Sequence, residues 1–380
     1  MEYRNIGKTG MAASVIGLGA EHLDGKPFPI VEETVHAALD HGINMIDIFM
    51  PGDEIRRNIG KALGNRRKDV IIQGHIGSVD LREQYDTSRD LSVCRHFFEK
   101  LLKNLDTDYI DVGMLFFIDS DEELQQIHAN GILDYALEMK RNGMIRAIGT
   151  SSHNPVVARK LLETGSVDLL MFSINPAFDM TPTGTDVLST FEELEKQQYV
   201  TIDPVRAGLY QYCEQQGIAI TVMKTLGGGR LLSADHSPFK KPMTVAQCIH
   251  YVLTRPAVVS AMVGCQSAIQ IKEAVNYLST TTEQRDYMDI ISEYCGELYG
   301  KCVYCNHCQP CPVGIDIATV SKYLDIALLD ENHIPPSIKQ HYQSLPANGA
   351  DCISCGDCEA KCPFAVPVIK NMEYAAKLLV

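Results

Sequence analysis

The sequence lacks the features of a membrane protein, a nucleic-acid binder or an exported protein. No stretch of about 20 uncharged apolar residues could span a bilayer. Basic residues are in the minority, with 34 Lys and Arg against 48 Asp and Glu, and the formal charge of −14 disfavours binding to a phosphate backbone. The N-terminus has no apolar segment followed by a small-residue cleavage site. These absences predict a cytoplasmic protein without a nucleic-acid or membrane partner.

The length and composition favour a folded chain with more than one domain. At 380 residues, the chain exceeds the ~250 to 300 residues that one hydrophobic core usually supports. Apolar residues make up 45% of the chain and charged residues 22%, close to the averages for globular proteins. A large domain joined to a small one is therefore expected.

Eight of the thirteen cysteines fall into two short runs near the C-terminus. The first run is Cys302, Cys305, Cys308 and Cys311, and the second is Cys352, Cys355, Cys358 and Cys362. A proline follows each run, and the second run has the spacing of bacterial ferredoxins, with two, two and three intervening residues. The first run departs from that spacing, because only two residues separate its third and fourth cysteines. Such spacing predicts metal sites in a reducing compartment rather than disulfides.

The two runs predict two [4Fe-4S] clusters whose ligands cross between them. Three closely spaced cysteines can hold three corners of one cubane, while the fourth cysteine of the run reaches the other cluster. One predicted ligand set is therefore Cys302, Cys305, Cys308 and Cys362, and the other is Cys352, Cys355, Cys358 and Cys311. A pair of four-cysteine zinc sites is the alternative. Apolar residues at helical intervals from Ile315 to Leu329 predict a helix between the runs, so residues 283–380 are interpreted as a helical linker and a small α-helical ferredoxin-like domain.

Residues 1–282 alternate short β-rich runs with amphipathic segments. The candidate strands are Val15–Leu18, Met45–Ile48, Val70–Gln73, Ile110–Phe117, Ile145–Gly149, Leu169–Ile174, Ile218–Met223 and Val258–Val263. Candidate helices include Val31–Asp40, Ser88–Leu105 and Asn130–Arg141, and a long connection from Asp179 to Gln216 contains the helical pieces FEELEKQQ and DPVRAGLYQYCEQQ. Eight strands alternating with helices predict an α/β fold, a (β/α)8 TIM barrel, with a doubly wound sheet as the alternative.

Five segments of this domain resemble the aldo/keto reductases. They are YRNIGKTGMAASVIGLG, HGINMIDIF, IRRNIGKALGNRRKDVII, GMIRAIGTSSHNP and GIAITVMKTLGGGRLL. Together with the two trailing cysteine runs, they are similar to the ferredoxin-fused branch of that family, a group of cytoplasmic oxidoreductases.

The resemblance implies a catalytic site in which most family residues are replaced. Aldo/keto reductases place an Asp, a Tyr, a Lys and a His at the barrel mouth, where the Tyr protonates a carbonyl that receives hydride from NADPH. Asp47 matches the Asp, but Pro51 replaces the Tyr, His75 replaces the Lys, and Phe116 or Phe117 replaces the His. We predict Asp47 and His75 as catalytic residues, with His75 as the substitute acid because imidazole titrates near neutral pH.

Two further histidines are expected on the same rim. His22 follows the first strand and His153 follows the fifth. Either could be a proton donor, and metal ligation is the alternative.

The residues that bind nicotinamide in the family also differ in this chain. The family's Ser-Asn pair is Ser151-Ser152, its carboxamide-binding Gln is Met171, and its stacking aromatic is Met223. The segment GCQSAIQIKEA lacks the basic residues that commonly grip the 2′-phosphate of NADPH. FMN is therefore predicted ahead of NAD(P)H, since a flavin can exchange single electrons with clusters and pass a pair to an organic substrate.

Glycine-rich loops after the seventh and eighth strands predict a phosphate site, because such loops offer backbone N–H groups and a helix N-terminus. The predicted cofactor-binding residues are Ser151, Ser152, Asn175, Lys224, Gly227, Gly228, Gly229, Arg230, Gly264, Gln266 and Ser267.

These features together predict an anaerobic iron–sulfur oxidoreductase. It would pass electrons through two clusters to or from a flavin or a small organic substrate in the barrel. A soluble electron donor or acceptor such as a ferredoxin or flavodoxin is the expected partner. The alternatives are an NAD(P)H-dependent carbonyl reductase with a remodelled site, and a catalytically inactive barrel that serves as a scaffold for an electron carrier.

Overall fold

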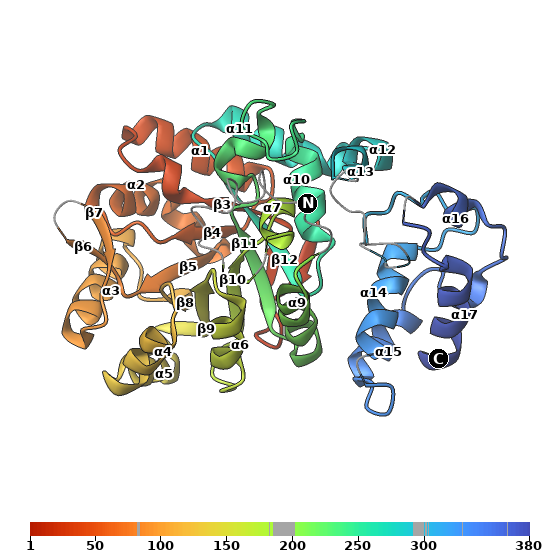
Figure 1. The fold of residues 1–380 in the computed structure, drawn as a ribbon. Helices are drawn as coiled ribbons and strands as arrows, with labels where there is room; N and C mark the ends of the chain where they lie inside the picture. The colour runs from red at the N-terminus through yellow and green to blue at the C-terminus, as the bar shows by residue number, and fades with distance from the viewer. Residues whose placement is uncertain are drawn as a thin grey trace. The chain divides into compact units, whose positions relative to one another are not determined.

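The computed structural model describes most of the chain, which forms two units (Figure 1). The described residues are 1–81, 84–181, 183–184, 202–291, 300, 302, 304–328, 330–362 and 364–380. The first unit comprises Met1–Asn175, Gly217–Gly228 and Ala257–Leu278, and the second comprises Pro176–Gln216, Gly229–Pro256 and Ser279–Val380. The domain boundary expected after residue 282 stays a prediction.

The first unit is built on a closed barrel of eight parallel strands, which confirms the predicted fold. The strands are β3 (Ile16–Gly19), β4 (Met45–Ile48), β5 (Ile71–Ile76), β8 (Ile110–Leu115), β9 (Ile145–Ser152), β10 (Leu169–Ser173), β11 (Ala219–Met223) and β12 (Val258–Gly264). Their order around the barrel follows the chain, and β12 pairs with β3 to close it. A doubly wound sheet is thus wrong for this chain, because an open sheet would leave these two strands unpaired.

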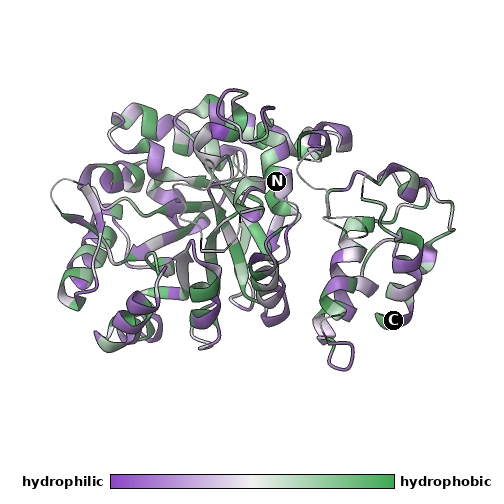
Figure 2. Cartoon of the chain, viewed as in Figure 1, coloured by the Kyte–Doolittle hydropathy of each residue, from purple (hydrophilic) through white to green (hydrophobic). Residues whose placement is uncertain are grey.

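Amphipathic helices alternate with these strands, and Figure 2 shows hydrophobic and hydrophilic residues side by side on them. The helices of the first unit are η1 (Ala20–Leu23), α1 (Phe28–Asp40), α2 (Asp53–Leu63), η2 (Gly64–Asp69), α3 (Leu91–Leu105), α4 (Asp121–Ala129), α5 (Ile132–Arg141), α6 (Pro155–Leu162), α11 (Ala268–Val275) and η4 (Asn276–Ser279). Two predicted helix starts are too early. Helix α3 begins after Asp90, whose carboxylate caps it by accepting from the Val93 N–H, and α5 begins after Gly131, whose φ of 74° breaks the helix.

Two short hairpins were not predicted. They pair β1 (Tyr3–Asn5) with β2 (Ala12–Ser14), and β6 (Ser78–Leu81) with β7 (Gln84–Thr87).

Methionine fills much of the barrel interior. Six methionines belong to one buried core cluster: Met11, Met45, Met114, Met171, Met223 and Met262. Two glycines leave room for these side chains. A Cβ on Gly17 would lie 2.4 Å from the sulfur of Met262, and a Cβ on Gly149 would lie 2.2 Å from the sulfur of Met114.

The second unit is helical. Its elements are α7 (Pro176–Asp179), α9 (Pro204–Gln216), η3 (Gly227–Leu232, which begins in the first unit), α10 (Val245–Leu253), α12 (Thr282–Arg285), α13 (Met288–Ile291), α14 (Ile317–Ala327), α15 (Pro336–Gln343), η6 (Gly349–Asp351), α16 (Asp357–Lys361) and α17 (Val368–Leu378). Helix α14 confirms the predicted helix between the cysteine runs, and α9 confirms the second helical piece of the long connection. The first piece, FEELEKQQ, lies outside the described residues.

A buried carboxylate joins three helices of this unit. Asp179 accepts hydrogen bonds from the hydroxyls of Tyr210 (2.6 Å) and Tyr251 (2.9 Å) and from Nε of Arg206 (3.2 Å). Because Arg206 is also buried, the two charges compensate each other and α7, α9 and α10 are fixed together. Across the described part of the chain, we find no helix long and apolar enough to cross a membrane.

Candidate functional site

A line of polar side chains crosses the barrel interior near the C-terminal ends of the strands. Nε2 of Gln73 on β5 donates to Oδ1 of Asp47 on β4 at 2.9 Å, and Nε2 of His75 lies 2.8 Å from the same oxygen. Thr221 on β11 donates to Oε1 of Gln73 at 2.8 Å, and these four residues are at most 3% exposed. The structure therefore brings the predicted pair Asp47 and His75 together.

Sequence reasoning missed Gln73 and Thr221. Gln73 lies two residues before His75 and therefore shares its face of the strand, so strand alternation could have found it. Thr221 carries no comparable signal.

His75 uses only one of its ring nitrogens. Its Nδ1 is buried and makes no hydrogen bond to any residue that the structure describes. With Asp47 ionised, the proton lies on Nε2 and Nδ1 is free to accept a hydrogen bond, or to donate one when the ring is doubly protonated. A buried polar atom without a partner costs about 1–3 kcal/mol, so a substrate or cofactor atom is expected to pair with it.

Phe116 and Phe117 stack on each other where the family has its histidine. Their ring centroids are 4.0 Å apart, and the His75 ring meets Phe116 edge-on at 5.2 Å. Phe117 has a left-handed φ of 43°, which is strained for a bulky residue. Its N–H donates to Oγ of Ser151 (2.9 Å) and its carbonyl accepts from Arg89 (2.6 Å), so hydrogen bonds hold the backbone on both sides of Phe117. Strain of this kind is concentrated at functional sites.

A second imidazole–carboxylate pair lies beyond Phe117. Nδ1 of His153 is 2.9 Å from Oδ2 of Asp119, and Oδ1 of Asp119 accepts from the Ser152 hydroxyl at 2.8 Å. Burial raises the pKa of the Asp119 carboxyl, but the hydrogen bonds from His153 and Ser152 and the charge of His153 lower it more strongly, so the pKa falls below its usual value. The His153 ring is 4.9 Å from Phe117, so a histidine lies at each end of the phenylalanine stack. Asp119 was missed, although an acidic residue four positions after the end of the fourth barrel strand is a usable signal.

The third rim histidine lies elsewhere on the barrel. His22 is exposed, and its ring lies against Gly264 at the end of β12, where a Cβ would come within 2.5 Å of Cδ2 of His22. Gly264 is therefore needed for this contact.

Some of the predicted cofactor-binding residues are brought together at the end of β11. Asn175 donates from Nδ2 to the carbonyl of Lys224 (2.9 Å), and the Gly227 N–H donates to the same carbonyl (2.8 Å). Lys224 is exposed and has a left-handed φ of 63°. Gly227, Gly228 and Gly229 follow with φ values of 60°, 66° and 86°, which side chains other than glycine rarely adopt, and Arg230 continues η3.

The remaining predicted cofactor-binding residues are engaged within the fold or lie at a helix start. The Ser151 and Ser152 hydroxyls pair with Phe117 and Asp119, as described above. The Gln266 N–H donates to Oε1 of Gln270 at 2.7 Å, and Ser267 precedes α11 without a side-chain capping bond. A cofactor role for these residues stays a prediction.

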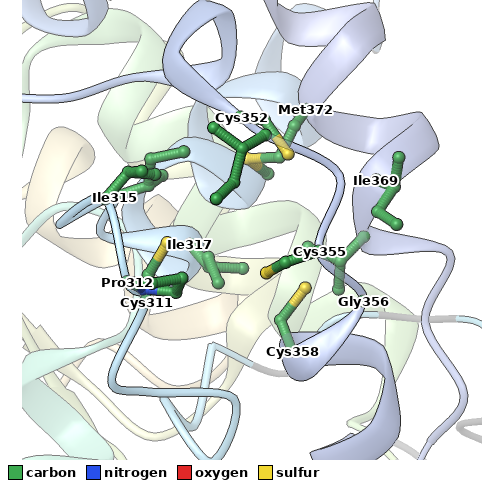
Figure 3. A pocket seen from close by; sticks show the side chains of 13 residues that line it. Cys311, Pro312, Ile315, Ile317, Cys352, Cys355, Gly356, Cys358, Ile369 and Met372 are labelled. Atoms are coloured by element: carbon green, nitrogen blue, oxygen red, sulfur yellow. The ribbon is translucent and has the colours of Figure 1, made fainter.

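Four cysteines from both runs line one hollow of the second unit (Figure 3). Cys311 of the first run lies there with Cys352, Cys355 and Cys358 of the second run. The other lining residues are glycine or apolar: Pro312, Val313, Ile315, Ile317, Ile353, Gly356, Val368, Ile369 and Met372. The hollow encloses about 370 Å³, including the part open to solvent, and its four thiols are those predicted for one cluster.

The first three cysteines of the first run have raised pKa values. Burial raises the pKa of Cys302 to about 11 and that of Cys305 to about 12, and the charge of Cys362 raises both. Burial also raises the pKa of Cys308, as do the charges of Cys302, Cys305 and Cys362. Because such charge effects weaken with distance, they favour the predicted ligand set of these four cysteines.

Thiolates are the ligands of iron–sulfur clusters, so both sets suit such a group. Within the described ranges, no three or more His, Cys, Asp or Glu side chains lie close enough to hold a single metal ion.

Comparison with known proteins defines the family of the barrel. A model of the aldo/keto reductase family matches residues 15–247. The chain belongs to this family. Among curated relatives, the "Uncharacterized oxidoreductase YqkF" of Bacillus subtilis (strain 168) is 26% identical over 291 residues, which cover 72% of this chain and 90% of the relative. The L-galactose dehydrogenase of Arabidopsis thaliana is 25% identical and covers 72% of this chain and 87% of its own length.

Solved aldo/keto reductase structures share the fold. The holo form of AKR11C1 from Bacillus halodurans matches with a TM-score of 0.59 at 20% identity, covering 79% of this chain and 99% of that one. An aldo/keto reductase from Klebsiella pneumoniae, solved with NADP and acetate, matches with a TM-score of 0.55 at 18% identity, covering 76% and 94%. As a member of this family, the chain is an oxidoreductase.

Proposed function

We propose that the chain is an aldo/keto reductase of the ferredoxin-fused type, whose cysteine runs hold two [4Fe-4S] clusters. The observation that carries the proposal is the hollow that Cys311 of one run shares with Cys352, Cys355 and Cys358 of the other. In two-cluster ferredoxins, the fourth cysteine of each run ligates the other cluster, and this arrangement has the same crossing. The effect of the Cys362 charge on the first three cysteines of the first run supports the second ligand set.

The residues around each set have separate roles in this function. When bound, such clusters accept and release one electron each. The apolar lining of the hollow, including Ile315, Ile317 and Met372, would give one cluster a largely apolar environment. A soluble one-electron carrier such as a ferredoxin or flavodoxin is the proposed partner, and it would supply or remove these electrons.

The barrel residues handle the proton and the substrate. Asp47 holds the His75 ring through Nε2 and leaves Nδ1 to accept or donate a proton at a small organic substrate. Asp119 orients His153 through Nδ1 in the same way. The stacked Phe116 and Phe117 rings separate the two histidines, and the partly exposed Phe117 gives the substrate an apolar contact.

A second candidate function is an NAD(P)H-dependent carbonyl reductase in which the clusters take no part in turnover. Two observations favour it: the structural relative from Klebsiella pneumoniae was solved with NADP, and the pairing of His75 with Asp47 provides a substitute for the missing tyrosine acid. The first of these observations supports NAD(P)H as the barrel cofactor in this second candidate function, although the sequence favours FMN.

A census of iron, acid-labile sulfide and zinc in protein purified without oxygen tests the main proposal. About eight irons and eight sulfides per chain are expected for two four-iron clusters. Cys358→Ser should lower both counts, whereas Cys94→Ala, at a buried cysteine outside the runs, should leave them unchanged. Stoichiometric zinc without sulfide would overturn the proposal. Steady NADPH-dependent aldehyde turnover by cluster-free protein would favour the second candidate function.

A further inference from the structure

A chain of hydrogen bonds between four side chains crosses the barrel from one wall to the other. Thr221 on β11 donates to Gln73 on β5, and Gln73 donates to the Asp47 oxygen that also contacts His75. In the strand order, β11 and β5 stand on opposite sides of the eight-stranded barrel. The chain therefore runs through the buried interior, and it ends at the ring of the predicted acid.

The contacts of Gln73 fix which way its side-chain amide faces. Its Oε1 accepts from the Thr221 hydroxyl at 2.8 Å. Its Nε2 lies 2.9 Å from Oδ1 of Asp47 and 3.6 Å from the sulfur of Met171. A carboxylate and a thioether accept hydrogen bonds but do not donate them. A rotated amide would turn its own oxygen toward the carboxylate, so the two ends of the chain together keep the N–H group on the Asp47 side.

This N–H group acts on the charge of Asp47. The residue is 3% exposed, and a carboxylate withdrawn from water keeps its charge only where hydrogen-bond donors replace the water. In the part of the chain that the structure describes, its side-chain donors are Gln73 and His75, and both bond to Oδ1. The amide of Gln73 does not titrate, so it stabilises the anion whether the imidazole is neutral or charged.

The charge of Asp47 decides what Nδ1 of His75 can do. Beside an ionised Asp47, the ring keeps a proton on Nε2, so Nδ1 accepts a proton when the ring is neutral and donates one when the ring is charged. A protonated Asp47 would instead donate to Nε2 and leave the hydrogen of a neutral ring on Nδ1. A neutral imidazole is a far weaker acid than an imidazolium, so this second arrangement is unsuited to protonating a substrate.

We propose that Gln73 and Thr221 are positioning residues that keep Asp47 ionised. His75 can then transfer a proton through Nδ1, which neither of the two residues contacts. Their surroundings support the assignment, because methionines and other apolar side chains form the core cluster of the barrel, where an apolar side chain would pack without needing hydrogen-bond partners. The inference rests on the proton-transfer role of His75 in the proposed function.

The first test follows the carboxyl group of Asp47 by infrared spectroscopy of the full-length protein at neutral pH. Isotope-labelled aspartate and Asp47→Asn assign its band, and wild type should show a carboxylate. Gln73→Leu should lower the ratio of ionised to protonated Asp47 by about tenfold or more, the effect of one hydrogen bond to a charged group, so that the band of a protonated acid appears. Thr221→Val should act in the same direction but less strongly, because the amide remains.

Two further variants separate this effect from a general disturbance of the barrel. Thr221→Ser keeps the hydroxyl and should restore the wild-type spectrum. Thr150→Val is the matched control, because Thr150 is also a buried barrel threonine but donates to the Leu115 carbonyl, outside the chain.

The second test reads the His75 ring by nitrogen-15 NMR, with His75→Gln to assign its signals. In wild type, Nε2 should be protonated, and Nδ1 should carry a proton only when the whole ring is charged. In Gln73→Leu, a neutral ring with its proton on Nδ1 should appear. This change cannot come from loosened packing alone, because it requires a proton to move from the ring to Asp47.

The outcomes separate the inference from the function on which it rests. A protonated Asp47 in Gln73→Leu and Thr221→Val, but not in Thr221→Ser or Thr150→Val, supports the inference. An ionised Asp47 in every variant overturns it and leaves the proposed function standing, and an equal acid band in Thr150→Val also overturns it. The proposed function fails separately if wild-type protein lacks iron and sulfide, or if His75→Gln keeps wild-type turnover, and neither result alters the two spectra.

Discussion

The polar residues of the barrel mouth lie on strands, whereas most cysteines of the two C-terminal runs lie in segments between short helices. Asp47 and Gln73 belong to strands of four and six residues that are hydrogen-bonded to neighbours on both sides. Cys352 and Cys355 precede α16, a helix of five residues, and Cys355 is exposed. The barrel thus fixes its site through strand pairing, whereas under the proposed function we expect the cysteine segments to depend on a bound cluster for their geometry.

The same contrast applies to stability. Backbone hydrogen bonds connect all eight strands into a closed barrel, and apolar side chains fill its interior. The cysteine segments belong to a small helical region, and regions of fewer than about 80 residues usually need a metal or disulfides to supplement their core. The predictions below test this difference, beginning with the largest expected effect.

Removal of iron should unfold the cysteine segments and leave the barrel folded. Structural metal sites contribute on the order of 10 kcal/mol to the domains that they stabilise, more than a small helical region provides by itself. In hydrogen exchange followed by mass spectrometry, α14 and α17 should lose protection after chelation, while β5 and β8 keep theirs. Unchanged protection of α14 would show that this region holds its fold without a cluster.

Under the second candidate function, His75→Gln should reduce NADPH-dependent aldehyde turnover by a factor of roughly 10² to 10⁴, the usual contribution of a positioned acid or base. His22→Gln is the matched control, because His22 lies exposed against Gly264 rather than beside Asp47. Steady-state rates with NADPH, together with iron content, distinguish a lost proton donor from a damaged fold. Wild-type rates in His75→Gln would remove this residue from the mechanism.

Gly60→Ala should destabilise the first unit more than Gly149→Ala. A Cβ on Gly60 would lie 2.7 Å from backbone atoms of Leu105, so α2 and α3 would have to separate, at a cost of about 1–3 kcal/mol. A Cβ on Gly149 meets the sulfur of Met114, and this flexible side chain can move aside. Urea unfolding of the two variants gives the comparison, and equal losses would mean that the methionine layer is as rigid as the backbone.

Asp119→Asn should have the smallest effect, and that effect should depend on pH. The pKa of Asp119 in the folded chain lies below its usual value of about 3.9. Its ionised form therefore stabilises the fold above about pH 4, and this stabilisation is lost as the pH falls through the folded-state pKa. The variant should melt at most about 2 to 4 °C below wild type at pH 7, with the gap closing below about pH 4. A gap that is constant with pH would show that packing, not charge, is responsible.

The sequence predicts the barrel well because its strands are buried on both faces. Such strands appear as continuous apolar runs, and all eight were found. The hairpin of β6 and β7 was missed because its residues, for example Asp80 and Gln84, are polar and give no strand pattern. Helix starts were misplaced where a cap or a glycine, such as Asp90 or Gly131, decides the first residue.

The candidate site could be predicted only in part. Asp47 and His75 follow from the family resemblance, because both stand at positions that the family's motifs define. The hydrogen bond between Thr221 and Gln73 joins residues 148 positions apart, and no local pattern in either strand predicts it. The cofactor role of Ser152 stays a prediction, and the pairing of its hydroxyl with Asp119 depends on the contact between strands β8 and β9.

Oxidation of the buried methionines of the first unit can show whether the barrel has opened. Oxidation converts a methionine into a polar sulfoxide, and the sulfurs of Met114 and Met171 are shielded from oxidants while the barrel stays closed. A molecule that opens in air can therefore be marked at these positions before it closes again. Because a sulfoxide disrupts an apolar interior, marked molecules open more readily and collect further marks. The sulfoxide content of an aged sample thus counts past unfolding events, and mass spectrometry can read it residue by residue.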